Sequence, residues 1–182
     1  KYVVITSVTR DDLRDGGASH FADVIQKVRE VNLGCKIEVL IPDLQGDMDS
    51  LNIILDAKPD VLNHNIEAVR SIFDKVRPGG DYERSLRLLS NISGCSVKSG
   101  FMVGLGESKE EVIKTMEDLS KSCDILTIGQ YLQPTKEHWP VSKYYSPDEF
   151  KDLKEIGAEM GFKHVESGPL VRSSYHAGEY GL

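Results

Sequence analysis

The chain has few cysteines, and none of them are paired at metal-binding spacing. Its 182 residues contain only Cys35, Cys95 and Cys123, with no Cys-x-x-Cys pair. An odd, widely spaced set predicts neither a disulfide framework nor a self-contained zinc or iron–sulfur site. We therefore expect these cysteines to be small apolar residues in or near the core. Such cysteine usage is more typical of a reducing compartment.

The chain also lacks basic runs and long apolar runs. It carries 22 Lys and Arg against 29 Asp and Glu, a formal net charge of −7. No basic–aromatic interleaving suggests nucleic acid as a partner, and no apolar run approaches the roughly 20 residues that span a bilayer. We expect neither nucleic acid nor a membrane as a partner. Apolar residues make up 40% and charged residues 28%, which is ordinary globular usage for one domain with a sizeable core.

Strand and helix patterns alternate along most of the sequence. Apolar, β-branched segments predict strands at 2–8, 36–41, 61–65, 99–103, 125–131 and 163–167. Amphipathic or capped segments predict helices after Ser19, at 48–55, 66–76 and 82–92, after Ser108, and from Pro147 behind Ser146. Repeated βα units imply parallel strands with right-handed crossovers. Five or six units are too few for an eight-unit barrel, so they fit a partial barrel or a doubly wound sheet.

The segment 98–107 joins a buried strand to a glycine turn at Gly104 and Gly106 and then to a helix start. Ser108 and Glu111 have the capping-box spacing. A turn without side chains at the carboxyl end of a strand lets backbone approach a ligand closely. The alternative is a plain βα connection with glycines for tight packing.

Polar residues also follow the other predicted strands. They are Thr6, Arg10 and Asp11 after the first, Asn63, His64 and Asn65 after the third, and Gln130 after the fifth. These sets converge if the sheet is parallel. Strand alternation would point Asn63 and Asn65 to one side and His64 to the other. Asn65 alternatively caps the following helix, and the charges after the first strand alternatively form a solvated turn.

The end of the chain, from Gly168, is irregular and polar and contains Arg172-Ser-Ser-Tyr-His176. A serine two residues from a histidine suggests hydrolysis, but no nucleophile-elbow pattern surrounds either serine. The alternative is a polar tail that docks onto one end of a barrel.

Taken together, these segments resemble the lipoyl synthase family of radical S-adenosylmethionine enzymes. The similar segments cover nearly the whole chain in order: 2–17, 61–66, 77–86, 98–107, 129–135 and the Arg-Ser-Ser-Tyr signature at 172–175. The resemblance implies an α/β fold, a partial (β/α)6 TIM-like barrel core at 1–167, and a tail at 168–182. Family members carry two cysteine triplets before the segment that begins at Tyr2. We therefore expect a chain that is N-terminally truncated, which a start at Lys1 rather than Met also suggests.

The resemblance also implies site residues. Gly100-x-Met102-x-Gly104-x-x-Glu107 is similar to the motif that packs against adenine. Thr6, Arg10 and Asp11 lie where the family handles the methionyl end of the cosubstrate, and Gln130 lies near the adenosine. Strand alternation gives Asn63 as a further ligand-facing candidate. Ser174 corresponds to the family's serine ligand of an auxiliary iron–sulfur cluster, and Arg172 would supply positive charge beside it.

The implied activity inserts two sulfur atoms at carbons six and eight of an octanoyl group carried on a lysine. The implied cofactors are two 4Fe-4S clusters and S-adenosylmethionine, and the implied partners are an octanoylated lipoyl carrier domain and reduced flavodoxin or ferredoxin. The location would be cytoplasmic in a bacterium, and mitochondrial or plastid in a eukaryote. Two alternatives are a cluster-free barrel fragment that binds a nucleoside or a carrier protein, and an unrelated barrel lyase or isomerase. The latter would want a lysine or paired carboxylates at strand ends, whereas Lys98 is predicted at a strand's beginning, the wrong end.

Overall fold

The fold is built on one open sheet of six parallel strands. The computed structural model describes residues 1–180, and its sheet has the order β1-β2-β3-β4-β5-β6. The strands are β1 (Tyr2–Thr6), β2 (Lys36–Leu40), β3 (Val61–Asn63), β4 (Ser96–Val103), β5 (Ile125–Gln130) and β6 (His164–Gly168). Each strand pairs in parallel with the next, and within the described residues β1 and β6 do not pair with each other. The parallel (β/α)6 partial barrel predicted from the sequence is therefore confirmed.

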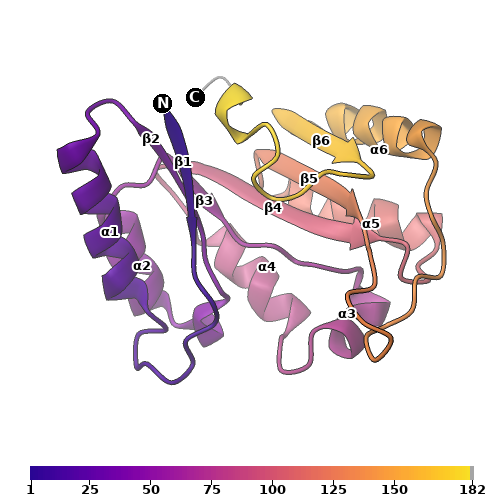
Figure 1. Cartoon of the computed structure of the whole chain (residues 1–182), viewed down its shortest axis with the longest axis horizontal. Coiled ribbons are helices and arrows are strands. Elements are labelled where there is room, and N and C mark those ends of the chain that lie inside the picture. Colours follow the sequence, from indigo (N-terminus) through magenta and orange to yellow (C-terminus); the bar gives the residue numbers. More distant parts are fainter. Residues whose placement is uncertain (181–182) are drawn as a thin grey trace.

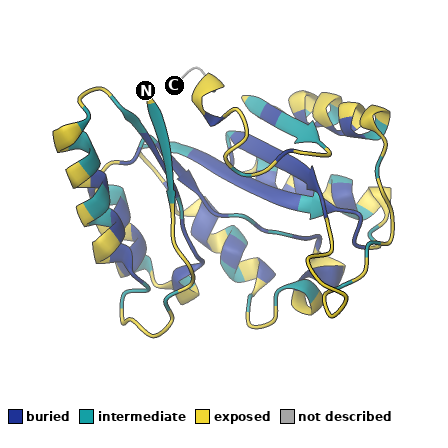
Figure 2. Ribbon diagram, viewed as in Figure 1, coloured by how far each residue is buried: buried dark blue, intermediate teal, exposed yellow. Residues whose placement is uncertain are grey.

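The helices cover the outer side of this curved sheet, as Figure 1 shows. They are α1 (Ala18–Val31), α2 (Met48–Asp56), α3 (Arg70–Val76), α4 (Tyr82–Ser90), α5 (Lys109–Ser120) and α6 (Pro147–Glu159), with 3-10 turns at η1 (Leu44–Gly46) and η2 (Ala177–Glu179). Strands β2 to β5 are mostly buried, whereas the outward faces of the helices are exposed (Figure 2). The predicted capping boxes at Ser108 and Ser146 are both present. No helix within residues 1–180 combines the length and apolar character needed to cross a membrane.

Two predicted helix starts are wrong, and each has a physical reason. The helix expected from residue 66 begins only at Arg70, because the backbone of Glu67 bonds to β4 through Gly100 and Met102 and so extends the sheet. Ser19 does not cap α1. The carboxylate of Asp15 instead accepts hydrogen bonds from the N–H groups of Gly17 and Ser19, which satisfies two donors of the first turn.

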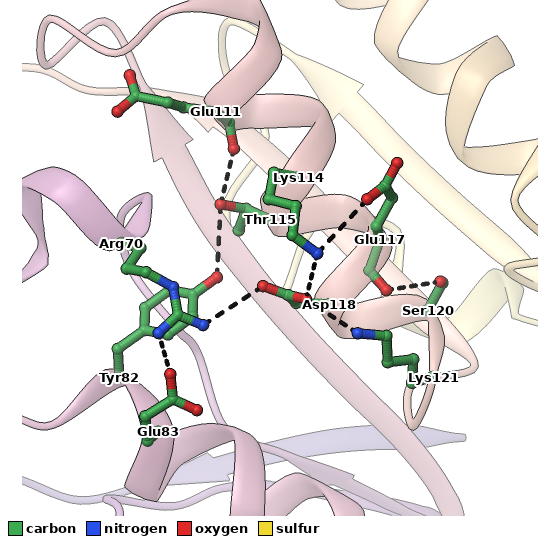
Figure 3. Close-up of polar contacts among 10 residues, drawn as sticks. All are labelled: Arg70, Tyr82, Glu83, Glu111, Lys114, Thr115, Glu117, Asp118, Ser120 and Lys121. Carbon is green, nitrogen blue, oxygen red and sulfur yellow. Dashed lines mark hydrogen bonds and ion pairs between the residues drawn. The ribbon is translucent and has the colours of Figure 1, made fainter.

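A polar cluster ties α3, α4 and α5 together on the outer side of the sheet (Figure 3). The guanidinium of Arg70 lies 4.3 Å from the ring centroid of Tyr82, pairs with Glu83, and lies 3.5 Å from Asp118. Burial opposes ionisation of Asp118, but hydrogen bonds from lysines on α5 and just after it outweigh burial and lower its pKa. The cluster orients helices and lies away from the inner face of the sheet.

The C-terminal tail lies on the inner face, opposite the helices. It leaves the carboxyl end of β6 at Gly168 and returns to η2 beside the start of β1 (Figure 1). Gly178 lies against Tyr2, where an added Cβ would be 3.5 Å from the tyrosine Cβ. The prediction of an irregular tail therefore describes residues 169–176, while residues 181 and 182 lie outside the described part of the chain.

Candidate functional site

A cavity of about 230 Å³ lies between the inner face of β4 and β5 and the C-terminal tail. We call it the β4–β5 cavity. Gly100 and Met102 of β4 line it, opposite their register partners Thr127 and Gly129 of β5. Val171, Arg172 and Ser173 form the tail side, and Asn65 and Glu67 form the end that follows β3. The cavity thus occupies the carboxyl half of a parallel sheet, where α/β folds bind ligands.

Two glycines keep this cavity open. A Cβ on Gly100 would collide with the Thr127 hydroxyl and lie 3.0 Å from the Thr127 carbonyl oxygen. A Cβ on Gly129 would collide with the carbonyl oxygen of Val171. Glycine at both positions therefore lets the tail and a flat ligand approach the strand backbone closely. Gly100 was predicted from the sequence, and Gly129 was not.

Asn65 and Glu67 lie at the junction of this cavity with a second one of about 150 Å³, which Thr6 and Arg77 also line. The side-chain oxygen of Asn65 is buried and has no hydrogen-bond partner among residues 1–180. Glu67 has a φ of +67°, an uncommon conformation for a residue other than glycine. Burial raises the pKa of its carboxyl, although the positive charge of Arg77 opposes this. The sequence reasoning missed Glu67 because nothing local marks it.

Of the three residues predicted at and after the carboxyl end of β1, only Thr6 lines either cavity. Thr6 lines the second cavity, and its hydroxyl donates to the Leu40 carbonyl at 3.1 Å. Arg10 instead forms a two-pronged ion pair with Asp12 at 2.7 and 2.8 Å. Asp11 is exposed and lines neither cavity. The alternative of a solvated turn with an Arg–Asp pair therefore describes Arg10 correctly.

Gly104, Glu107 and Gln130 belong to a separate cluster that fixes the loop at 131–145. The Glu107 carboxylate accepts from the N–H groups of Gly104 and Leu105 at 2.6 and 2.8 Å and from the Tyr145 hydroxyl at 3.0 Å. Gln130 donates to the Lys143 carbonyl and accepts from the Tyr145 N–H. A Cβ on Gly104 would collide with Gln130, and none of the three predicted residues lines the β4–β5 cavity. Glu107 instead lines a third cavity of about 170 Å³ beside α5 and α6, and the assignment of the three residues to the adenosine stays a prediction.

A buried polar cluster lies on the inner face toward the amino ends of the strands. Glu38 accepts from the Tyr2 hydroxyl at 2.7 Å, from Lys98 Nζ at 2.8 Å, and from Asn63 Nδ2 at 3.1 Å. The side chains of Lys98 and Glu38 have no exposed surface. Burial lowers the pKa of Lys98 while the charge of Glu38 opposes this, and burial together with Glu38 raises the pKa of the Tyr2 hydroxyl. Asn63 faces inward as predicted, but onto Glu38 rather than a cavity.

Of the two predicted tail residues, Arg172 lines the cavity and Ser174 does not. Arg172 lines it and donates to the Val171 carbonyl at 2.6 Å. Ser173 also lines the cavity, whereas Ser174 is exposed and is the next residue along the tail. The hydroxyl of Ser174 makes no hydrogen bond within residues 1–180, so it is available to another group.

The cysteines do not gather in this part of the molecule. Burial raises the pKa of Cys95 to about 11 and that of Cys123 to about 12, so both are protonated thiols at neutral pH. Within residues 1–180, no group of three or more His, Cys, Asp or Glu side chains has a geometry that would hold a metal ion. The chain's one predicted metal-binding side chain therefore remains Ser174.

Comparison with known proteins identifies the class of this fold. The profile of the radical SAM superfamily matches residues 1–119, and the chain belongs to that superfamily. The chain is similar in structure to methylornithine synthase, whose crystal structure is known, with a TM-score of 0.64 and 16% sequence identity. The superposition covers 94% of this chain and 58% of the methylornithine synthase chain. That likeness supports the fold alone.

Particular relatives are much closer in sequence. The chain is similar to the lipoyl synthases of Rubrobacter xylanophilus (55% identity), Geobacillus kaustophilus (55%) and Caldanaerobacter subterraneus subsp. tengcongensis (53%). These matches cover 98%, 98% and 97% of this chain, but 57%, 62% and 64% of the relatives. The chain thus spans about three fifths of the curated proteins that it matches, and the resemblance found from its motifs is confirmed.

The β4–β5 cavity fits the cofactor that the superfamily name implies. Gly100 and Gly129 leave room that a Cβ would fill, and the unpartnered Asn65 oxygen is a hydrogen-bond acceptor for an amino or hydroxyl group. Both features suit a nucleoside. An iron–sulfur cluster is also implied, and among residues 1–180 no group of His, Cys, Asp and Glu side chains forms a complete ligand set for it.

Replacement of Gly100 by valine is expected to weaken S-adenosylmethionine binding by about tenfold or more. The added side chain enters the cavity beside Thr127, and overpacking a fitted site typically costs about 1–3 kcal/mol. Isothermal titration calorimetry measures the effect. Gly157→Ala is the matched control, because its Cβ would meet only Val165 and Met116 in the core. Equal affinity in a folded Gly100→Val protein would contradict the cavity assignment.

Proposed function

We propose that the full-length protein is a lipoyl synthase that inserts two sulfur atoms into an octanoyl group carried on a lysine. The observation that carries this proposal is the β4–β5 cavity of a radical SAM fold, whose tail wall includes Arg172 and Ser173, the first two residues of the Arg172-Ser-Ser-Tyr175 signature. Identity of 53–55% to curated lipoyl synthases over 97–98% of this chain supports it. The cavity suits the nucleoside, and the tail brings a hydroxyl ligand next to it.

When bound, S-adenosylmethionine and two 4Fe-4S clusters would supply the radical chemistry and the sulfur. The chain's own residues bind and orient these groups. Gly100 and Gly129 admit the nucleoside, and Asn65 accepts a hydrogen bond from it. Ser174 offers an oxygen ligand, which matches a soft iron–sulfur centre less well than a thiolate does. A displaceable ligand of that kind suits a cluster that gives up its sulfur.

Arg172 supplies positive charge at the tail wall of the cavity, close in sequence to the proposed ligand Ser174. Cations of this kind stabilise anionic groups through charge-assisted hydrogen bonds. Thr6 and Glu67 line the adjoining cavity, where they could meet the amino-acid end of the cosubstrate. The octanoylated lipoyl carrier domain and an electron donor of the flavodoxin or ferredoxin type are the proposed partners.

The direct test is product analysis with the full-length protein. An octanoyl-lysine peptide from a lipoyl domain is incubated with reconstituted protein, S-adenosylmethionine and a reductant, and analysed by mass spectrometry. We expect a product in which two hydrogen atoms are replaced by two sulfur atoms, together with 5′-deoxyadenosine. Release of 5′-deoxyadenosine without sulfur insertion into any octanoyl carrier tested would retain the superfamily assignment and reject lipoyl synthase activity.

A further inference from the structure

Lys98 of the buried inner cluster donates hydrogen bonds to the C-terminal tail. Its ammonium group donates to three acceptors: Glu38 at 2.8 Å, the Tyr180 hydroxyl at 2.9 Å, and the carbonyl oxygen of Ser173. An ammonium group has three N–H donors, so all of them are used. Two of the three acceptors belong to the tail, which contacts the barrel here through a charge rather than through apolar packing alone.

Tyr180, near the end of the tail, contacts the Lys98 ammonium through both its hydroxyl and its ring. Its hydroxyl accepts from Lys98 and donates to the Tyr175 carbonyl at 3.2 Å, and Lys98 Nζ lies 4.7 Å from its ring centroid. The ring also packs edge-on against Tyr2 of β1 at 6.4 Å and lies 4.6 Å from His164 of β6. The tail segment between Ser173 and Tyr180 is therefore held at both ends by one buried cation, and it spans from β1 to β6.

We propose that Lys98, supported by Glu38, is a positioning residue that pins the tail across the inner face and thereby places Ser174. Ser174 is the residue directly after the anchored Ser173 carbonyl. The hydrogen bond from Lys98 of β4 to the Ser173 carbonyl therefore helps to fix the backbone at Ser174. The role as a ligand rests on the proposed function, whereas the anchoring of the tail does not.

The anchor favours the docked tail because Lys98 has no other way to satisfy its donors in that position. Hydrogen bonds to charged groups are stronger than those between neutral groups, and a buried donor left unsatisfied is destabilising. Loss of the anchor should therefore raise the population of the undocked tail strongly without unfolding the barrel. Local openings of this kind are visible to proteolysis.

The test uses trypsin, because Arg172 is exposed and is followed by Ser173. The Arg172–Ser173 bond is therefore a natural cleavage site at the start of the anchored segment. In the full-length protein, Lys98→Met combined with Glu38→Leu removes the ammonium without leaving a buried carboxylate alone. We expect cleavage after Arg172 to be about tenfold faster or more. Tyr180→Phe, which keeps the ring, should give a smaller increase in the same direction. Lys163→Met, which removes an exposed ion pair with Asp124, is the matched control.

A second readout separates positioning from mere support of the fold. In the reconstituted protein, the Mössbauer spectrum of the auxiliary cluster should change in the Lys98→Met/Glu38→Leu variant as it does in Ser174→Ala, with total iron and melting temperature retained. Unchanged cleavage in both the double variant and Tyr180→Phe would overturn the inference, whatever the spectrum. Faster cleavage with a spectrum insensitive to Ser174→Ala would instead overturn the ligand assignment of the proposed function and leave the tail anchor supported.

Discussion

Replacement of Ser174 by alanine is expected to abolish sulfur insertion while cleavage of S-adenosylmethionine persists. Ser174 is exposed on the tail, next to a residue that lines the β4–β5 cavity, and is itself absent from the cavity wall. Loss of its hydroxyl should therefore spare cosubstrate binding and remove only the proposed cluster ligand. We expect product formation to fall by about a hundredfold or more, the upper end of what groups supporting a metal site contribute.

The measurement compares the product by mass spectrometry with 5′-deoxyadenosine by chromatography, in the same reaction. Ser90→Ala, an exposed serine at the end of α4, is the matched control and should behave as wild type. Ser174→Cys offers a stronger ligand and should retain the cluster while slowing sulfur release. Parallel loss of both products in Ser174→Ala would show that the serine supports the structure rather than the cluster.

Replacement of Glu38 by leucine is expected to lower the free energy of unfolding by about 3–5 kcal/mol, because it leaves the Lys98 ammonium buried without its counter-ion. The additional change Lys98→Met should recover much of the loss, since an apolar pair needs no desolvation of charge. Chemical denaturation of the two single variants and the double variant measures the coupling. Glu30→Gln removes an exposed pair with Lys27 and should change stability little. Additive losses in the double variant would contradict the buried pair.

The parts of the fold that the sequence predicted are those fixed by neighbours along the chain. Ser108 with Glu111, and Ser146 with Glu149, form their capping boxes within one helical turn. The order of the βα units followed from hydrophobic periodicity and from the glycines and prolines that separate the elements. That order in turn implied parallel strands. The helix expected from residue 66 failed because Glu67 makes its backbone bonds with β4, more than thirty residues away.

In the site, too, features set by neighbours along the chain were predicted, and features set by residues distant in sequence were not. Gly100, Met102 and Arg172, which were predicted separately as site residues, line one cavity, because the tail folds back over the carboxyl half of the parallel sheet. Lys98 was assigned no role, since its partners lie 60, 75 and 82 residues away in sequence. Gly104 was assigned to the adenine site from its motif, and the Gln130 side chain that lies beside it comes from the next strand, β5. The sequence around the turn at Gly104 cannot predict that the loop at 131–145 will pack against it.

One wall of the β4–β5 cavity is made by the tail itself, through Val171, Arg172 and Ser173. Occupancy of the cavity and order of the tail are consequently linked quantities, and each must favour the other by the same factor. A saturating nucleoside should slow hydrogen exchange in the tail, and a loosened tail should shorten the nucleoside's residence time. The residence time of the bound nucleoside should therefore measure how firmly residues 171–173 of the tail are docked on the sheet.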